Sequence, residues 1–120
     1  MAHSSGKNHA YPRLARVNQI LREVISDELM RISDVDDRFG ILTITGVDTT
    51  PDLRQAVVFF DSLDAEDRAL LDERRAQLQS AVNTQTRLKR TPKLTFMADP
   101  AVASGEAVDE ILRRRSHDEH

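Results

Sequence analysis

The sequence predicts an α+β domain in which helices pack on a three-stranded sheet. After Pro12, apolar residues recur at a period near 3.6, which is typical of a long amphipathic helix. Runs rich in β-branched or aromatic residues begin at Ile41, Ala56 and Lys93 and are bounded by turn residues, which is typical of strands. A chain of 120 residues fits one such domain. The predicted order of elements is α-β-β-α-(α)-β-α.

The first helix is predicted to run from Pro12 through about Met30. Pro12 lies near the first turn, where a proline is tolerated. The acidic stretch SDVDDRFG at residues 33–40 breaks the helical period, so we expect a loop there. Residues 1–10 are polar and contain a glycine and two serines, and we expect them to form a flexible N-terminal arm. The apolar positions of the helix are Leu14, Val17, Leu21, Val24, Ile25 and Leu29.

The next two runs, ILTITGV from Ile41 and AVVFFDSL from Ala56, predict an antiparallel hairpin. Pro51 and Asp52, which lie between the runs, are turn formers. Gly46 inside the first run indicates a bulge or a close approach of another part of the backbone.

A helical crossover is predicted to follow the hairpin. Asp64 is a good N-cap residue, and Glu66 and Asp67 lie in the first turn, where the helix dipole favours negative charge. The apolar stripe of this helix consists of Leu71, Leu78 and Val82. Counted at 100° per residue, Arg74 and Arg75 lie on either side of that stripe. Either their stems lie along its rim or the helix bends there. The crossover lets the third strand return parallel to a neighbour, with the helices on one face.

A short helix is predicted to end the domain, introduced by Ser104 and Gly105. The domain is therefore expected to span residues 11–112, and residues 113–120 to form a flexible tail of mixed charge. The apolar face of this last helix consists of Val108, Ile111 and Leu112.

Positive charge is concentrated in one segment of an acidic chain. Residues 74–98 carry six cations and no Asp or Glu, which leaves −9 for the remainder because the total is −3. Such a segment predicts a polyanionic partner, although a solvated helix face and strand edge would have the same composition. Aromatic platforms are nearly absent from it, which favours recognition of RNA shape and backbone over unstacked bases. The predicted RNA-binding residues are Arg74, Arg75, Arg87, Lys89, Arg90 and Lys93.

Other kinds of function find little support in the sequence. The absence of cysteine excludes disulfides, thiolate metal sites and a cysteine nucleophile. The cluster of Asp34, Asp36 and Asp37 lacks the glycine and the bidentate glutamate of a calcium loop, and all four histidines lie in the predicted tails. No phosphate-binding glycine loop, nucleophile motif, secretory signal or membrane-length apolar run is present. We expect a cytoplasmic protein that is not an enzyme, with no cofactor, metal, membrane or small-molecule substrate.

Four segments carry a resemblance to a known family. They are RLARVNQILREVISDEL, DRFGILTITGVDTTPDLRQAVVFFDSL, QTRLKRTPKLTF and SGEAVDEILRR. The second is the most specific, because DxR, TxTxV and PDLRxAxV occur there in order. From about Pro12 to Leu112, the chain resembles bacterial ribosome-binding factor A.

The resemblance implies a KH-like fold of type II topology, α-β-β-α-kink-α-β, with an extra C-terminal helix. It also implies a monomeric, non-enzymatic assembly factor whose partner is the free small (30S) ribosomal subunit. Such a factor assists maturation of 16S rRNA, including processing at the 5′ end of the precursor, matters most in the cold and leaves before translation begins.

The resemblance also bears on particular residues. The family's basic run before the third strand falls on Arg87, Lys89 and Arg90. The family carries AxG at its helical kink in place of the GxxG loop of other KH domains, and here those positions hold residues 74–76, Arg-Arg-Ala. Arg38 and Arg54 match family positions as well, but the acidic residues beside them favour local ion pairs.

Two other functions stay open from the sequence. One is a general single-stranded RNA-binding module without ribosome specificity, against which the sparse aromatics argue. The other is a protein-binding adaptor that uses the acidic helix of residues 20–37 as its interface.

Overall fold

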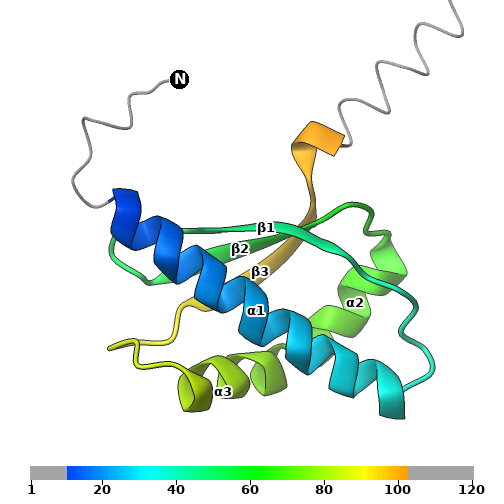
Figure 1. Ribbon diagram of the computed structural model, residues 1–120. Helices are drawn as coiled ribbons and strands as arrows, with labels where there is room; N and C mark the ends of the chain where they lie inside the picture. Colours follow the sequence, from blue (N-terminus) through cyan, green and yellow to red (C-terminus); the bar gives the residue numbers. More distant parts are fainter. Residues whose placement is uncertain (1–10, 103–120) are drawn as a thin grey trace, which may run out of the picture.

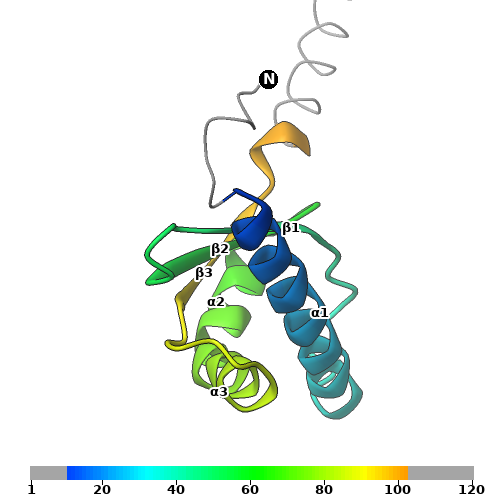
Figure 2. The same cartoon turned by 60° about the vertical axis from the view of Figure 1, so that its left-hand side comes forward.

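The computed structural model describes residues 11–102, which form three helices against one sheet (Figure 1). The sheet has the strand order β1-β2-β3, with β1 and β2 antiparallel and β2 and β3 parallel. Figures 1 and 2 show the helices on one side of this sheet. The predicted α+β fold, hairpin and parallel third strand are confirmed. The elements are α1 (Tyr11–Val35), β1 (Ile44–Thr49), β2 (Gln55–Phe60), α2 (Ala65–Glu73), α3 (Arg75–Gln85) and β3 (Lys93–Ala98).

Three sequence expectations fall outside the described residues: the N-terminal arm, the helix introduced by Ser104 and the C-terminal tail. Helical residues already begin at Pro100 and continue to Val102, where the description ends. Asp99 caps this stretch, because its carboxylate accepts a hydrogen bond from the backbone N–H of Ala101 at 2.9 Å.

The core lies between the helices and the inner face of the sheet. Burial alternates along β2 and β3, so that Val58, Phe60, Leu94 and Phe96 point inward while Met97 is 37% exposed. This alternation is the pattern of a sheet with one packed face and one open face. The helices contribute fully buried side chains to the same core, namely Leu21, Ile25, Ile32, Leu71, Leu78 and Val82.

Two predicted boundaries are wrong. The first helix continues to Val35 through three residues that were predicted as loop, because Ile32 extends the apolar stripe and is fully buried. β1 begins at Ile44 and not at Ile41. Ile44 already pairs with Phe60, the last residue of β2, so the residues before it have no strand to pair with.

The glycine in the first strand marks a bulge, one of the two predicted alternatives. The register of β1 against β2 shifts between Ile44 and Gly46, which leaves Thr45 without a partner in the ladder. The Thr45 hydroxyl instead donates to the carboxylate of Asp99 at 2.6 Å. The bulge therefore ties the start of the hairpin to the end of β3.

Side chains of α1 cover the outer edge of β1. The Asn18 side-chain oxygen accepts from the backbone N–H of Thr49 at 3.0 Å. One turn further along, the Arg22 guanidinium donates to the carbonyl oxygen of Ile44 at 3.2 Å. An edge strand exposes unpaired backbone groups, so these two contacts both protect β1 and set the direction of α1 across it.

The predicted N-cap of α2 is present as a full capping box. The Asp64 carboxylate accepts from the backbone N–H of Asp67 at 2.7 Å, and the Asp67 carboxylate accepts from that of Asp64 at 3.4 Å.

We expect Asp64→Ala to lower the free energy of unfolding by about 1 kcal/mol, since this change removes the cap but no buried surface. Urea denaturation measures the loss. Glu66→Ala, an exposed change in the same turn, is the matched control and should have a smaller effect. Equal losses in the two variants would mean that charge near the helix end, and not the cap, stabilises α2.

The helix of the crossover breaks at Arg74. A bend at this point was one of the two alternatives that the sequence left open for the arginines beside the apolar stripe. Arg74 has φ −97° and ψ 5° and is the single residue between α2 and α3. Its N–H is shared between the carbonyl oxygens of Leu70 and Leu71, both at 3.1 Å. The break falls where the resemblance places the family's kink, although the residue here is a large cation.

Candidate nucleic-acid interface

The predicted basic run lies in the loop between α3 and β3. Arg87, Lys89 and Arg90 are exposed there, and so is Lys93 at the start of β3. None of the four forms an ion pair with a carboxylate in the described part of the chain. The structure therefore brings these four predicted residues together on one short segment.

The loop is anchored between its cations. The Thr86 hydroxyl donates to the carbonyl oxygen of Val82 at 2.7 Å, and the Thr91 hydroxyl donates to a side-chain oxygen of α3 at 3.1 Å. Leu88 packs against the core and Pro92 is buried. Anchors and exposed cations thus alternate, so the cations are presented on a segment held by the rest of the domain.

Arg74 is engaged inside the domain. Its guanidinium donates to the Asp36 carboxylate at 3.0 Å and to the Gln77 side-chain oxygen at 2.9 Å. The side chain is 27% exposed, and its Nε is buried with no acceptor among the described residues. These contacts join the helix break to the end of α1.

Arg75 is also engaged. Its guanidinium donates to the Asp72 carboxylate at 2.7 Å and lies 5.8 Å from the centre of the Phe96 ring. Arg74 and Arg75 lie at the start of α3, about 15 Å along that helix from the basic loop at its end. The structure therefore does not bring these two predicted residues together with the other four.

Asp36 is the centre of an ion-pair cluster, which we define as Asp36, Arg38, Glu73 and Arg74. Arg38 donates to the Asp36 carboxylate from Nε at 2.9 Å and from Nη2 at 2.7 Å, and it also donates to Glu73 at 2.6 Å. Hydrogen bonds from Arg38 first, and from Arg74 next, hold the pKa of Asp36 well below its usual range. The expectation that Arg38 pairs locally is confirmed.

The other arginine with that expectation is Arg54. Its Nε lies 3.8 Å from the Asp52 carboxylate, so it too has a local partner, though a looser one. The Arg54 carbonyl oxygen accepts from the backbone N–H of Lys93 at 2.8 Å, which attaches the hairpin turn to the start of β3.

A groove of about 470 Å³ lies beside the basic loop, between the N-terminal half of α1 and residues 85–88. We call it the arginine groove. Arg13 and Arg16 line one side and Arg87 lines the other, while Val17, Ile20 and Leu88 supply its apolar surface. The three arginines are exposed, and within residues 11–102 none pairs with a carboxylate.

Sequence reasoning missed Arg13 and Arg16, although a signal was present. Residues 11–22 contain three arginines and no Asp or Glu, so the first half of α1 is a second acid-free stretch. Its spacing places Arg13, Arg16 and Ile20 on one helical face. Only the fold shows that this face lies opposite Arg87.

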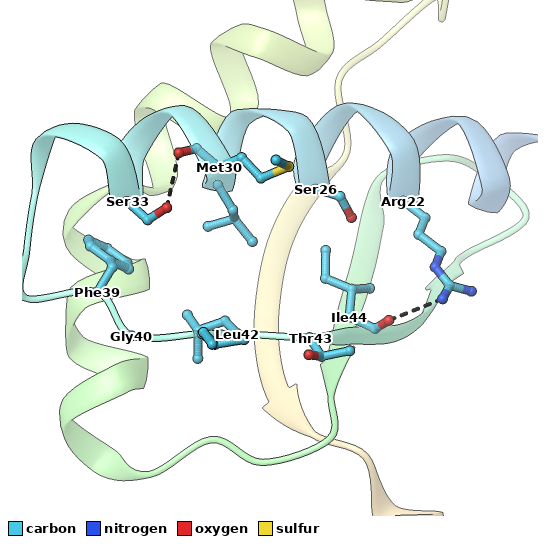
Figure 3. A pocket seen from close by; sticks show the side chains of 11 residues that line it. Arg22, Ser26, Met30, Ser33, Phe39, Gly40, Leu42, Thr43 and Ile44 are labelled. Atoms are coloured by element: carbon cyan, nitrogen blue, oxygen red, sulfur yellow. Dashed lines mark hydrogen bonds between the residues drawn. The ribbon is translucent and has the colours of Figure 1, made fainter.

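A second hollow of about 440 Å³ separates α1 from residues 39–44 (Figure 3). Its one charged lining residue is Arg22, whose guanidinium is already bonded to the carbonyl oxygen of Ile44. Met30 and Ile41 give it exposed apolar surface. With a single, engaged cation, this hollow is a poor site for phosphate.

Metal-binding and membrane-spanning features are both absent from the described residues. Between residues 11 and 102, no cluster of three or more acidic or histidine side chains is arranged to hold a metal ion. In the same part of the chain, no helix has the length and apolar character needed to span a membrane.

One long helix, a hairpin, two helices joined at a break and a parallel third strand together define an α+β domain of the KH-like class. The sequence model of the family described as Ribosome-binding factor A matches residues 13–112. The chain belongs to this family.

Curated relatives agree with the family match. Ribosome-binding factor A of Rubrobacter xylanophilus is 37% identical over 108 residues, which cover 87% of this chain and 88% of the relative. The protein of the same name from Limosilactobacillus reuteri is 33% identical over 105 residues, covering 81% and 88% respectively.

Solved structures show the same fold. The crystal structure of ribosome-binding factor A from Thermus thermophilus has a TM-score of 0.64 at 22% identity, covering 71% of this chain and 94% of that one. A homology model of the Thermus thermophilus factor, fitted into the cryo-EM map of a 30S–RbfA complex, has a TM-score of 0.52 at 23% identity. It covers 78% of this chain and 94% of that one.

Proposed function

We propose that the protein binds the free small ribosomal subunit and assists its assembly. This proposal rests on the exposed basic segment at the end of α3, which has no carboxylate partner among residues 11–102, in a chain that belongs to the ribosome-binding factor A family. A related factor has been fitted into the map of a 30S complex. The 16S rRNA of the subunit is the polyanion that such a surface would contact.

Within this proposal, Arg87, Lys89 and Arg90 make the principal RNA contacts and Lys93 adds to them, since all four are exposed on one segment. Arg74 and Arg75 belong to the same acid-free region, but their guanidiniums bind Asp36 and Asp72. We assign them the part of holding the helix break, through which they shape the surface that RNA meets.

The finer parts of the proposal rest on family membership. The protein supports processing at the 5′ end of the 16S precursor and is needed most in the cold. It acts as a monomer in the cytoplasm and without catalysis, because its task is to bind RNA in one state of the subunit and then leave.

Co-sedimentation with purified small and large subunits at two salt concentrations tests the proposal. We expect the protein to pellet with small subunits only. Single-stranded contacts lose about 0.7 of a log unit of affinity per log unit of salt for each phosphate, so four contacts give a slope of roughly −3. Equal binding to both subunits, or binding that ignores salt, would contradict the proposal.

A further inference from the structure

We propose that the arginine groove binds one unpaired nucleotide of RNA, with its phosphates at the guanidiniums and its base on the aliphatic floor. The proposal deepens the proposed function and rests on it, because it names the form of RNA that this part of the surface accepts. The groove has about 470 Å³, which is within the size range of sites for small molecules.

Charge argues for an anionic occupant. Two acid-free stretches that are far apart in the sequence, residues 11–22 and 74–98, meet at this groove. Arg13, Arg16 and Arg87 approach it from both sides and keep their charge free of carboxylates within residues 11–102. Guanidinium groups match phosphate oxygens in geometry as well as in charge.

The apolar floor argues for an unpaired base over a duplex. In an RNA helix the flat faces of the bases are stacked inside, and a protein surface meets phosphates, 2′-hydroxyls and the polar edges of bases. Ile20 and Leu88 would therefore find no apolar face of a base on a duplex. An unpaired base can bring an apolar face to them. Arginine planes also stack on bases, which offsets the lack of an aromatic side chain among the described residues that line the groove.

The floor is built by side chains with defined support. Val17 is buried, and Ile20 and Leu88 are partly buried and pack against the core. The Thr86 hydroxyl bond to Val82 holds the opposite wall in place. The groove therefore has little to rearrange when it binds, which lowers the entropic cost of binding.

Fluorescence anisotropy with two probes, a labelled single-stranded oligouridylate and a blunt-ended RNA duplex, tests the proposal on the full chain. The floor variant Ile20→Ala/Leu88→Ala should bind oligouridylate roughly tenfold more weakly, because it removes apolar surface that the base would cover, and should bind the duplex as the wild type does. The charge variant Arg13→Ala/Arg16→Ala should weaken oligouridylate binding as well. Met30→Ala/Ile41→Ala, which trims exposed apolar side chains of the other hollow (Figure 3), is the matched control and should change neither affinity.

Two results would overturn the proposal. One is a floor variant that binds both probes like the wild type or weakens both equally. The other is a charge variant that binds oligouridylate like the wild type but has lost the binding of an acidic peptide that the wild type shows, which would make the groove a protein-binding site.

Photo-crosslinking decides the matter if the floor variant fails to fold. Wild-type protein is irradiated with an oligonucleotide that carries 4-thiouridine, and the linked peptides are mapped. Crosslinks to residues 13–20 or 85–88 support the proposal, and crosslinks confined to residues 89–93 overturn it.

Co-sedimentation separates this proposal from the proposed function. If wild-type protein pellets with small subunits but the floor variant shows no selective loss of oligouridylate, the groove proposal fails and the proposed function stands. If the groove binds oligouridylate as described but the wild type ignores small subunits, the proposed function fails instead.

Discussion

Changing Arg87, Lys89 and Arg90 together to alanine is expected to abolish binding to small subunits while the fold stays intact. The three side chains are exposed and make no ion pair within the described residues, so their removal takes nothing from the core. At about 1 kcal/mol or more for each lost charge-assisted contact, affinity falls by roughly a hundredfold or more. The salt slope should also become shallower by about 2.

Co-sedimentation with small subunits measures the loss, and a thermal melt shows whether the variant is folded. A pair of double variants controls for net charge. Lys89→Ala/Arg90→Ala removes two cations from the basic loop, and Arg31→Ala/Arg68→Ala removes two exposed cations from other parts of the surface; their affinities for small subunits are compared. Affinity in the triple variant equal to that of the wild type would refute the assignment of RNA contacts to this loop. Equal losses in the two double variants would show that only the overall charge matters.

Much of the fold could be predicted because its signals are local. The Asp64 cap, the bulge beside Gly46 and the hairpin turn each depend on a few neighbouring residues. The boundaries that were wrong depend on distant partners. Ile41 reads as part of a strand, but β2 ends at Phe60 and leaves it nothing to pair with. Ile32 lengthens α1 because it finds a place in the core.

The candidate site divides in the same way. The basic loop is visible in the sequence because its cations are neighbours. The arginine groove is not, because Arg13 and Arg87 are brought together only by the packing of α1 beside α3. The bend near Arg74 could be anticipated from helical geometry. The carboxylate that pairs with Arg74 could not, because Asp36 lies 38 residues earlier in the chain. Contacts between residues so far apart do not show in the periodicity of apolar residues along the sequence.

The Asp36 cluster makes a second strong prediction, on stability. Asp36→Ala removes the carboxylate that accepts from both Arg38 and Arg74 and leaves their donors without that partner in a partly buried place. Arg74 is only 27% exposed, so the loss of its anion costs more than the loss of an exposed ion pair, whereas Arg38 is 51% exposed and keeps Glu73. We expect the melting temperature to fall by several degrees, well beyond the effect of Asp37→Ala, an exposed neighbour.

The same cluster predicts a pH dependence. Because the pKa of Asp36 is depressed in the folded state, its contribution to stability is fully present above the ordinary aspartate pKa of about 4. The contribution is lost as the pH falls below that value towards the depressed pKa. The difference in melting temperature between wild type and Asp36→Asn should therefore be largest near neutral pH and shrink in acid. The comparison with Asp36→Asn is needed because the pKa values of Glu28, Asp52 and Asp99 are also lowered. Protonation of these three groups in acid destabilises both proteins.

Double substitution separates the two roles open to Arg74. If Arg74 serves the helix break through Asp36, then Arg74→Ala and Asp36→Ala should each destabilise, and their combination should fall short of the sum because the shared contact is lost only once. Subunit binding, measured in the cold where all variants are folded, should change little, since the basic loop lies at the far end of α3. Additive losses of stability would show that Arg74 does not act through Asp36. A large loss of affinity in Arg74→Ala alone would make Arg74 a direct RNA contact.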